Sequence, residues 1–186
     1  MKLKSMRFKC LSCGECCRWG GYAFLYPDDV TRISEHLNLT LQEFINKYCR
    51  LVFVEYNEDG EVTKIPYLML GRGENGCIML DGNLCSIHPV KPFQCEAAPF
   101  LAEFLLDDEG AKAFADNCRG LGRGPKFDIA EQRYRLSVQN DRDGDYEESL
   151  AAHNWNLAEL LGVSLPEPEV IESCGVIIDD EEYNED

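Results

Sequence analysis

The 186-residue sequence has few of the features that mark export or a membrane. Its first ten residues, MKLKSMRFKC, are basic but contain no continuous apolar stretch and no small-residue cleavage site. No apolar run approaches the ~18 residues that a membrane span needs. We therefore expect a cytoplasmic protein without membrane contact, in which clustered cysteines serve as metal ligands or catalysts rather than as disulfides.

Basic residues are scarce in the last quarter of the chain. Residues 1–138 hold 19 acidic and 17 basic side chains, whereas residues 139–186 hold 15 acidic ones and a single base, Arg142. Most of the net charge of −16 therefore belongs to the C-terminal end. Such a field repels phosphate backbones, so we expect no nucleic acid partner. An acidic segment is usually a solvated tail, and recruitment of a basic protein partner is the alternative.

Motifs for a reaction are also missing. The chain has three histidines, and no local motif for nucleophilic catalysis accompanies them. The glycine-rich run 119–125 lacks the Lys-Ser/Thr ending of a phosphate-binding loop. Asp141, Asp143 and Asp145 imitate a calcium loop, but Gly144 is misplaced and no closing glutamate stands at position twelve. The sequence therefore leaves open whether the protein is an enzyme.

Cysteine, by contrast, is abundant, with ten residues in the chain. Four of them fall in the run FKCLSCGECCRWGG between Phe8 and Gly21. Deprotonated thiols this close together form a soft donor set for zinc or iron, and two-residue gaps let consecutive sulfurs face one centre. Adjacent side chains generally diverge, so the Cys16–Cys17 doublet indicates either two centres or one centre with a spare thiol.

Four further cysteines each lie beside turn-forming residues. Together with the first four they make eight thiols, enough for two four-sulfur sites: Cys10, Cys13, Cys16, Cys17, Cys77, Cys85, Cys95 and Cys118. The alternative is that some of the second set are small buried core residues. We expect Cys49 to lie in the core and Cys174 to be a free thiol in the tail. His88 is expected to be structural, with a ligand role as its alternative.

Spacing alone does not decide the metal. Cys10, Cys13 and Cys16 match the first three positions of a bacterial ferredoxin run, but the fourth position is absent. A zinc ribbon needs a second close pair, which is also absent. The triple favours iron–sulfur, as [4Fe–4S], and zinc is the alternative. Either centre leaves about two negative charges to be offset. The candidate cations are Arg18, Lys91, Arg119 and Arg123.

The hydrophobic pattern predicts an α+β fold: a small cysteine-rich metal-binding domain with short hairpins, a few helices and an acidic C-terminal tail. Helices are expected over 27–37, 40–48, 128–138 and 147–161, the second and third with capping residues. Strands are expected over 51–56 and 61–70, with an interruption at Pro66, and a weaker pair over 100–106 and 111–115. We divide the chain into a cysteine-cluster domain (1–138), a helical segment packed on it (139–162) and a flexible acidic tail (163–186).

A hairpin that carries two cysteines is predicted around Asp81-Gly82. A three-residue loop, Asp81–Asn83, would place Met79 opposite Cys85, with Cys77 diagonally on the same face. A two-residue loop would place Ile78 opposite Cys85 and send Cys77 to the other face. The sequence does not choose between them.

The segment F-x-C-x-x-C-G-x-C-C, Phe8–Cys17, resembles the CxxCxxCC cysteine-cluster family of zinc- or iron-chelating proteins. Three later segments are similar to further motifs of that family: Gly76–Leu80 with Cys85–His88, Lys91–Cys95 with Pro99, and Cys118–Gly120. Lys91 and Glu96 stand where the family usually has arginine, which alters the charge near a thiolate. The resemblance implies that the eight cysteines are ligands, but it supplies no reaction. A related cluster occurs in flagellin lysine methylases, yet this chain shows no glycine-rich site for a methyl donor.

These observations predict a metal-binding protein, with iron–sulfur favoured over zinc, in a redox role or as an accessory to protein modification. The alternative is a non-catalytic, zinc-stabilised interaction module that uses its acidic tail for a basic partner. Metal delivery or storage is a third possibility.

Overall fold

The computed structural model describes residues 3–19, 22–58 and 61–170, and it combines helices with small sheets. The helices are α1 (Glu15–Arg18), α2 (Pro27–His36), α3 (Leu41–Tyr48), α4 (Phe93–Ala97), α5 (Ala102–Leu105), α6 (Asp108–Asn117), α7 (Ile129–Ala152) and α8 (Leu157–Leu161), with a 3-10 helix, η1 (His88–Val90). The strands are β1 (Met6–Phe8), β2 (Phe24–Leu25), β3 (Cys49–Glu58), β4 (Glu61–Leu70), β5 (Arg72–Gly73), β6 (Gly76–Cys77), β7 (Leu80–Asp81), β8 (Leu84–Cys85), β9 (Leu121–Phe127) and β10 (Pro168–Val170). This mixture confirms the α+β class.

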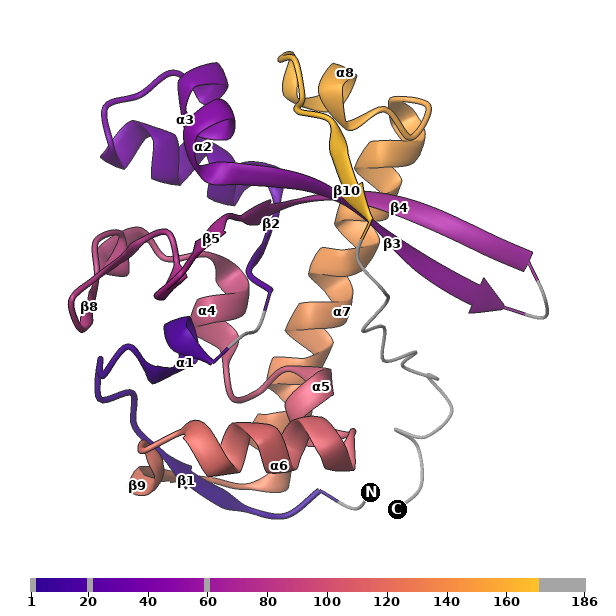
Figure 1. Ribbon diagram of the computed structural model, residues 1–186. Coiled ribbons are helices and arrows are strands. Elements are labelled where there is room, and N and C mark those ends of the chain that lie inside the picture. The colour runs from indigo at the N-terminus through magenta and orange to yellow at the C-terminus, as the bar shows by residue number, and fades with distance from the viewer. Residues whose placement is uncertain (1–2, 20–21, 59–60, 171–186) are drawn as a thin grey trace.

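The main sheet has four strands in the order β10-β3-β4-β2 (Figure 1). β3 and β4 form a long antiparallel hairpin, and β10 runs parallel to β3. The predicted interruption at Pro66 is wrong, because β4 continues through it with Pro66 opposite Phe53. The Tyr146 hydroxyl donates to the Pro66 carbonyl at 2.6 Å, so the edge of Pro66 that lacks an N–H faces α7 rather than β3.

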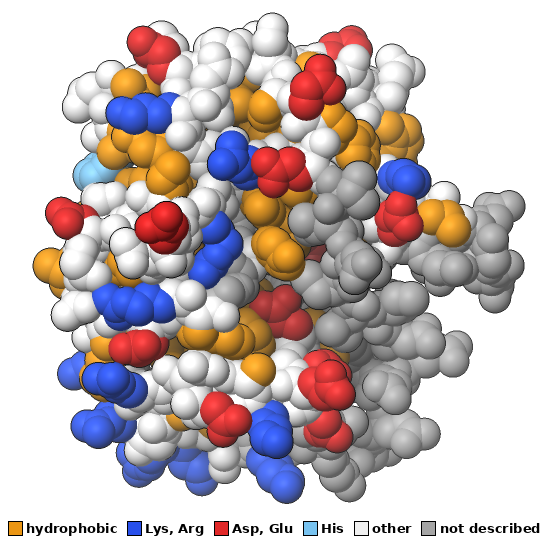
Figure 2. Space-filling model, in the orientation of Figure 1, with side chains coloured by type: hydrophobic (Ala, Val, Ile, Leu, Met, Phe, Trp, Pro, Cys, Tyr) orange, Lys and Arg blue, Asp and Glu red, His pale blue; other side chains and the backbone are white. Residues whose placement is uncertain are grey.

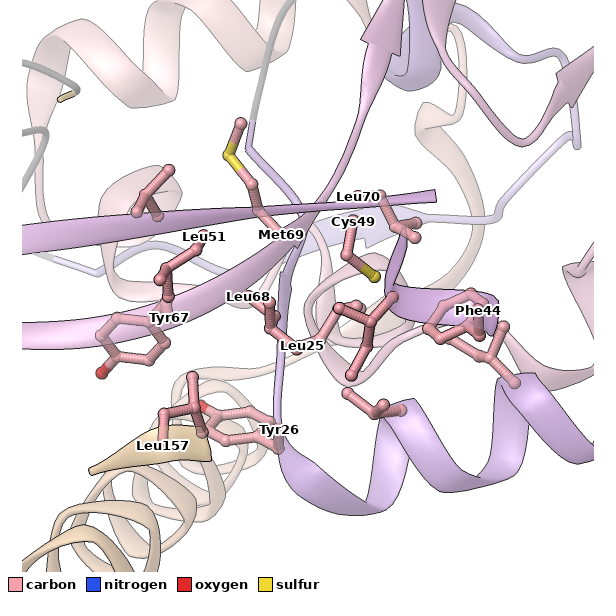
Figure 3. Close-up of a cluster of buried hydrophobic side chains, with 14 of the residues drawn as sticks. Leu25, Tyr26, Phe44, Cys49, Leu51, Tyr67, Leu68, Met69, Leu70 and Leu157 are labelled. Atoms are coloured by element: carbon pink, nitrogen blue, oxygen red, sulfur yellow. The ribbon is translucent and has the colours of Figure 1, made fainter. Parts of the chain in front are cut away.

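The principal core lies between this sheet, α2, α3 and the C-terminal half of α7, and Figure 3 shows part of it. Ile33, Phe44 and Leu68 are completely buried there. Cys49 is only 4% exposed in the same cluster, which confirms that it is a core residue. The predicted capping box of α3 is also present, with the Glu43 N–H donating to Thr40 Oγ1 at 3.2 Å.

One helix, α7, runs from the sheet to the opposite end of the molecule (Figure 1). The prediction of two separate helices, 128–138 and 147–161, is wrong here, because α7 is continuous across the expected break. Contacts with the core stabilise this middle part: Tyr146 and Leu150 are buried, and the Tyr26 hydroxyl donates to Asp143 Oδ1 at 2.6 Å. α7 therefore passes without interruption through residue 138, where the sequence analysis placed a boundary.

A smaller hydrophobic cluster fills the opposite end, around Phe100, Leu105 and Leu136. The strand pair predicted over 100–106 and 111–115 is wrong, because these segments contain α5 and α6. Asp107 explains the helix, since its side chain accepts the Gly110 N–H at 2.6 Å and caps α6.

Strands β1 and β9 form an antiparallel ribbon beside α6. β9 takes up much of the glycine-rich run 119–125, which was expected to be a loop. Met6 lies opposite Phe127, and Arg7 lies opposite Lys126. The ribbon joins the segment before the first cysteines to the segment after Cys118.

The end of the chain is described only in part. β10 belongs to the region 163–186 that was expected to be a flexible tail, and it pairs with β3. Residues 171–186, with Cys174, lie outside the described residues. Over the ranges that the structure describes, no helix combines the length and the apolar character needed to cross a membrane.

Candidate metal centre

The N-terminal cysteines lie on a loop and a single helical turn. Cys10 and Cys13 follow β1, and α1 carries Cys16 and Cys17. Gly14 starts α1 with a positive φ of 73°, and its carbonyl accepts the Cys17 N–H at 3.1 Å. α1 has no buried residue, so apolar packing contributes little to holding this turn.

A close backbone approach brings Cys77 beside α1. Gly76 precedes it in β6 with a φ of 111°, and a Cβ at Gly76 would overlap the carbonyl oxygen of Cys17 and lie 2.9 Å from Arg18 Cα. Only glycine fits this contact without strain. The glycine therefore sets the spacing between β6 and the Cys16–Cys17 turn.

Arg18 ties the same turn to the hairpin that precedes Cys85. Its guanidinium donates to the Cys13 carbonyl at 3.2 Å, to the Gly82 carbonyl at 2.7 Å and to the Asn83 side chain. A planar guanidinium can satisfy several acceptors in fixed directions, so this residue clamps two cysteine-bearing segments together.

The hairpins differ from both predicted registers. Leu80 lies opposite Cys85 and Asp81 opposite Leu84, so the two-residue loop consists of Gly82 and Asn83. Gly82 has a φ of 58°, a conformation that favours glycine and shifts the turn one residue beyond the expected Asp81-Gly82. Cys77 belongs to the preceding ribbon, where it lies opposite Arg72. The two cysteines thus lie on successive short ribbons rather than on one hairpin.

Cys95 is carried by α4, which the buried Asp29 fixes to the sheet side of the molecule. The carboxylate of Asp29 accepts the Phe93 N–H at 3.1 Å and the Tyr26 N–H at 3.2 Å. Gln94 accepts the Phe24 N–H at 2.8 Å, which ties α4 to β2. These bonds hold the helix, while Cys95 itself is exposed.

Cys118 ends α6 beside the first cysteine segment. Its N–H donates to the Phe114 carbonyl at 2.8 Å, and the Lys9 N–H donates to the Gly120 carbonyl at 3.2 Å. A Cβ at Gly120 would overlap the Lys9 carbonyl oxygen. The loop after Cys118 therefore lies directly against the residue before Cys10.

The charge of Cys16 affects the pKa of four other thiols. Burial is the largest cause that raises the pKa of Cys77, Cys85 and Cys118, and the charge of Cys16 raises each of them further. Cys95 is exposed as a whole residue, yet desolvation at its sulfur raises its pKa, followed by the charges of Cys16, Cys77 and Cys85. Thiolates that raise one another's pKa in this way need a cation between or beside them.

Burial raises the pKa of three of these thiols most, and nearby backbone N–H groups lower it in part. These groups belong to Met79 near Cys77, to Ile87 near Cys85, and to Gly120 and Leu121 near Cys118. In each case a donor lies two residues after the cysteine. This repeated arrangement stabilises thiolates, the form that binds metal.

The two neighbouring thiols Cys16 and Cys17 differ in their pKa. A hydrogen bond from the Cys17 thiol lowers the pKa of Cys16, and the charge of Lys91 lowers it further. The same bond, followed by burial, raises the pKa of Cys17. Without a metal, Cys16 is therefore the thiolate of the pair.

Basic side chains lie near several of the thiols, and one of them was not among the candidates selected from the sequence. Lys91 also lowers the pKa of Cys85 and Cys95, as expected of a candidate cation. Arg119 instead pairs with Glu15 at 3.4 Å. Arg72, which the sequence analysis did not select, lowers the pKa of Cys77. The role of Arg72 follows from the pairing of β5 with β6, which places Arg72 opposite Cys77. Figure 2 shows further Lys and Arg side chains at the lower left, over β1, β9 and α6.

Cys49 and His88, the other residues considered as possible ligands, have different surroundings. Cys49 lies in the core, where burial raises its pKa to about 12. His88 begins η1, and its Nε2 lies 3.4 Å from Ser12 Oγ, beside Cys13 in the sequence. Within residues 3–19, 22–58 and 61–170, no three His, Cys, Asp or Glu side chains are arranged closely enough to hold an ion. The backbone brings the cysteine-bearing segments side by side without such a cluster of side chains.

Comparison with known proteins agrees with the cysteine pattern. A family model named CxxCxxCC, described as "Putative zinc- or iron-chelating domain", matches residues 9–119. The chain is also 24% identical over 127 residues to the uncharacterized protein MJ0939 of Methanocaldococcus jannaschii. That alignment covers 65% of this chain and 39% of the relative, so the chain spans about two fifths of its length. No solved structure is significantly similar to this chain. The match over residues 9–119, which supports metal binding, shows that the chain belongs to the CxxCxxCC family.

Proposed function

We propose that eight cysteines bind metal in two adjoining groups and that the protein uses an iron–sulfur centre for electron transfer. The ligands are Cys10, Cys13, Cys16, Cys17, Cys77, Cys85, Cys95 and Cys118. The observation that carries the proposal is the backbone packing that brings the cysteine segments together, with Gly76 against Cys17 and the Cys118 loop against Lys9. Nearby backbone N–H groups would help to offset the charge of a thiolate-bound metal in a partly buried site.

We divide the ligands by the loops that carry them and by the charges that the thiols feel, with Cys16 acting on both groups. In the first group, the charges of Cys77 and Cys95 act on Cys17, and the charge of Cys85 acts on Cys77. Cys118 is coupled to Cys13 and Cys16. Cys10 joins this second group because Lys9 is bonded to Gly120. The Cys16–Cys17 doublet then lies at the junction of the two groups.

An electron-transfer role rests on the donor set and on its exposure. All eight donors are thiols, which suit iron–sulfur centres, and such a centre would supply one-electron chemistry when bound. Cys10 and Cys16 are exposed, so this part of the cysteine cluster lies near the surface that a redox partner would contact. Lys91, Arg72 and the N–H groups would tune the site by stabilising its negative charge. The same centre could serve as the accessory to a protein-modifying reaction.

A structural zinc site is the second candidate. α1 has no buried residue and the strands β5 to β8 have two residues each, so these loops have little core of their own. Metal crosslinks would stabilise such loops directly. In that case the chain would be an interaction module without catalysis.

Anaerobic purification with metal analysis and electron paramagnetic resonance tests the proposal. Iron and sulfide with broad visible absorption are expected, and two zinc ions with no iron per chain would establish the second candidate. Cys85→Ser and Cys118→Ser should each lose about half of the metal, while Cys13→Ser should lose metal and Cys174→Ser should not. Full metal content in Cys13→Ser would overturn the assignment of the ligands.

A further inference from the structure

An exposed ribbon at the end of the molecule opposite the sheet carries charge of one sign. We call residues 4–9 and 119–127 the basic ribbon, because they contain the paired strands β1 and β9 and every charged side chain in them is basic. These side chains belong to Lys4, Arg7, Lys9, Arg119, Arg123 and Lys126. All six residues are exposed, and Figure 2 shows Lys and Arg side chains gathered there at the lower left. A chain with a net charge of −16 thus presents a concentrated positive surface.

The two faces of the basic ribbon differ in character. Met6 lies opposite Phe127, and both pack against the hydrophobic cluster around Phe100. The neighbouring cross-strand pair, Arg7 and Lys126, faces away from that cluster, because successive side chains of a strand point to opposite sides. The apolar inner face holds the ribbon in place, so packing does not require the charges of the outer face.

The outer face sets like charges side by side. Arg7 and Lys126 lie directly opposite one another, an arrangement that destabilises a pair of strands. Arg7 donates to the Gly124 carbonyl at 2.8 Å, which holds its guanidinium without offsetting its charge. In the part of the chain that the structure describes, neither cation forms an ion pair, and neither do Lys9 and Arg123. An anionic partner would remove this repulsion.

Close backbone contacts fix the bulge that carries Arg123. The strand register shifts after Arg7, so residues 122–125 bulge out of β9. A Cβ at Gly124, which has a φ of 73°, would lie 2.5 Å from Lys9 Cβ. The bulge therefore packs directly against the opposite strand. A surface that is fixed in advance loses little conformational entropy when a partner binds.

We propose that the basic ribbon binds an acidic segment of a partner protein, rich in Asp and Glu. Complementary charge would guide such a partner to this end of a molecule whose remaining residues are acidic on balance. The Lys9 N–H donates to the Gly120 carbonyl at 3.2 Å, so a bound partner would lie beside the segments of Cys10 and Cys118. Electron exchange with that partner would rest on the proposed function, whereas the binding itself does not.

A nucleic acid fits this surface less well, although it is also an anion. The aromatic rings of the ribbon, Phe8 and Phe127, pack toward the hydrophobic cluster and offer no outer platform on which a base could stack. β9 has seven residues and spans at most about 23 Å at ~3.3 Å per residue. Phosphates beyond this length would meet exposed acidic residues such as Asp116 and Asp128, whereas a short acidic segment fits within it.

Charge reversal in the ribbon separates binding from folding. The probe is a labelled hexaglutamate peptide, and fluorescence anisotropy measures its binding to the purified full chain. Lys126→Glu should weaken binding by about tenfold, since it turns an attractive charge into a repulsive one. The variant should unfold at a temperature no lower than the wild type, because the new carboxylate would lie opposite Arg7. Metal content is measured separately, so a failure of the metal assignment would not be mistaken for a failure of binding.

Lys47→Glu, at an exposed position of α3 on the sheet side, is the matched control. It changes the net charge equally, but at about 0.1 M salt charges more than roughly 10 Å apart are largely screened. This variant should therefore bind hexaglutamate as the wild type does. Equal weakening in both variants, or no binding to the wild type at millimolar peptide, would overturn the proposal.

Two further results would assign the ribbon to a different occupant. Hexathymidylate that bound more tightly than hexaglutamate, and lost its binding in Lys126→Glu, would identify a nucleic acid. Self-association of the wild type that Lys126→Glu abolished would identify the acidic end of a second copy of this chain, and analytical ultracentrifugation measures it. Either result would rule out a separate acidic protein as the occupant.

Discussion

The sheet and the cysteine loops are held in place by different forces. β3 and β4 pair along ten residues each and cover a core in which Ile33, Phe44 and Leu68 are fully buried. The cysteine loops instead consist of one helical turn and two-residue strands. They are fixed by the close approach of Gly76 and by the bonds of Arg18.

Because of this difference, a bound metal would stabilise the cysteine loops more than the sheet. Burial of large apolar side chains stabilises the sheet without outside help, at about 1.5–3 kcal/mol for each fully buried side chain. The loops bury only a few large side chains, such as Met79 and Ile87, and their thiolates repel one another, so shared ligands would contribute much of their order. We therefore expect the sheet to stay folded in metal-free protein while the cysteine loops open.

The largest expected contrast is in thiol reactivity. In metal-free protein at pH 7, iodoacetamide should label Cys16 at least ~1,000-fold faster than Cys49, because only the thiolate reacts. Cys16 is exposed and its pKa is lowered by the bond from Cys17. Cys49 is 4% exposed, and burial raises its pKa to about 12. Peptide mapping by mass spectrometry measures both rates.

Two controls make this contrast decisive. Denaturant should make Cys49 as reactive as an ordinary thiol, and bound metal should protect Cys16. Comparable rates for Cys16 and Cys49 in folded metal-free protein would mean that the sheet side opens as readily as the loops.

The second largest expected effect comes from a substitution that disturbs the cysteine loops and leaves the sheet intact. Gly76→Ala should lower metal affinity by roughly tenfold or more, in the range seen when the support of a metal site is removed. The added Cβ would lie 2.9 Å from Arg18 Cα, and the φ of 111° disfavours alanine. Competition with a chelator measures the affinity.

Gly73→Ala is the matched control in the same two-strand ribbon. A Cβ there meets nothing within 4 Å, so metal affinity should be unchanged. Thermal unfolding of the sheet in metal-free protein should be the same for both variants. A Gly76→Ala protein that kept its affinity would show that the spacing of β6 and α1 does not matter for the site.

The sheet and the cysteine loops also differ in how much of each could be predicted from the sequence. Local signals were sufficient where neighbours in the chain decide the structure. The caps at Thr40 and Asp128 and the alternating strands of the β3–β4 hairpin are of this kind. Cys49 could be assigned to the core because it has no cysteine neighbour.

Contacts distant in the sequence decided the rest. The break expected over 139–146 is absent because Tyr146 packs in the core and Asp143 binds Tyr26, neither of which periodicity reveals. In the cysteine region, the eight thiols could be selected from spacing and resemblance. The hairpin register, the role of Arg72 and the approach of Gly76 to Cys17 depend on how separate loops pack.

The smallest expected effect is the pH dependence of folding stability at the end of the molecule opposite the sheet. Glu103 in α5 tests it. Burial raises the pKa of this carboxyl from its usual value near 4.5 to about 6. The folded state therefore holds the proton more tightly than the unfolded state, and this stability is present below pH 4.5 and lost as the pH rises to about 6. For a partly exposed group the loss should be roughly 1 kcal/mol.

Glu103→Gln should remove this dependence and make metal-free protein more stable at pH 7 by about the same amount, roughly 1 kcal/mol. Glu109→Gln, on the exposed surface of α6, is the control and should change little. Urea unfolding between pH 4 and pH 7 measures both. Bound metal acts in the opposite direction, since acid protonates its thiolate ligands and releases it. The helical end around α5 and the metal centre should thus respond to pH with opposite signs, and a Glu103→Gln variant that kept the wild-type pH dependence of stability would place its origin elsewhere in the fold.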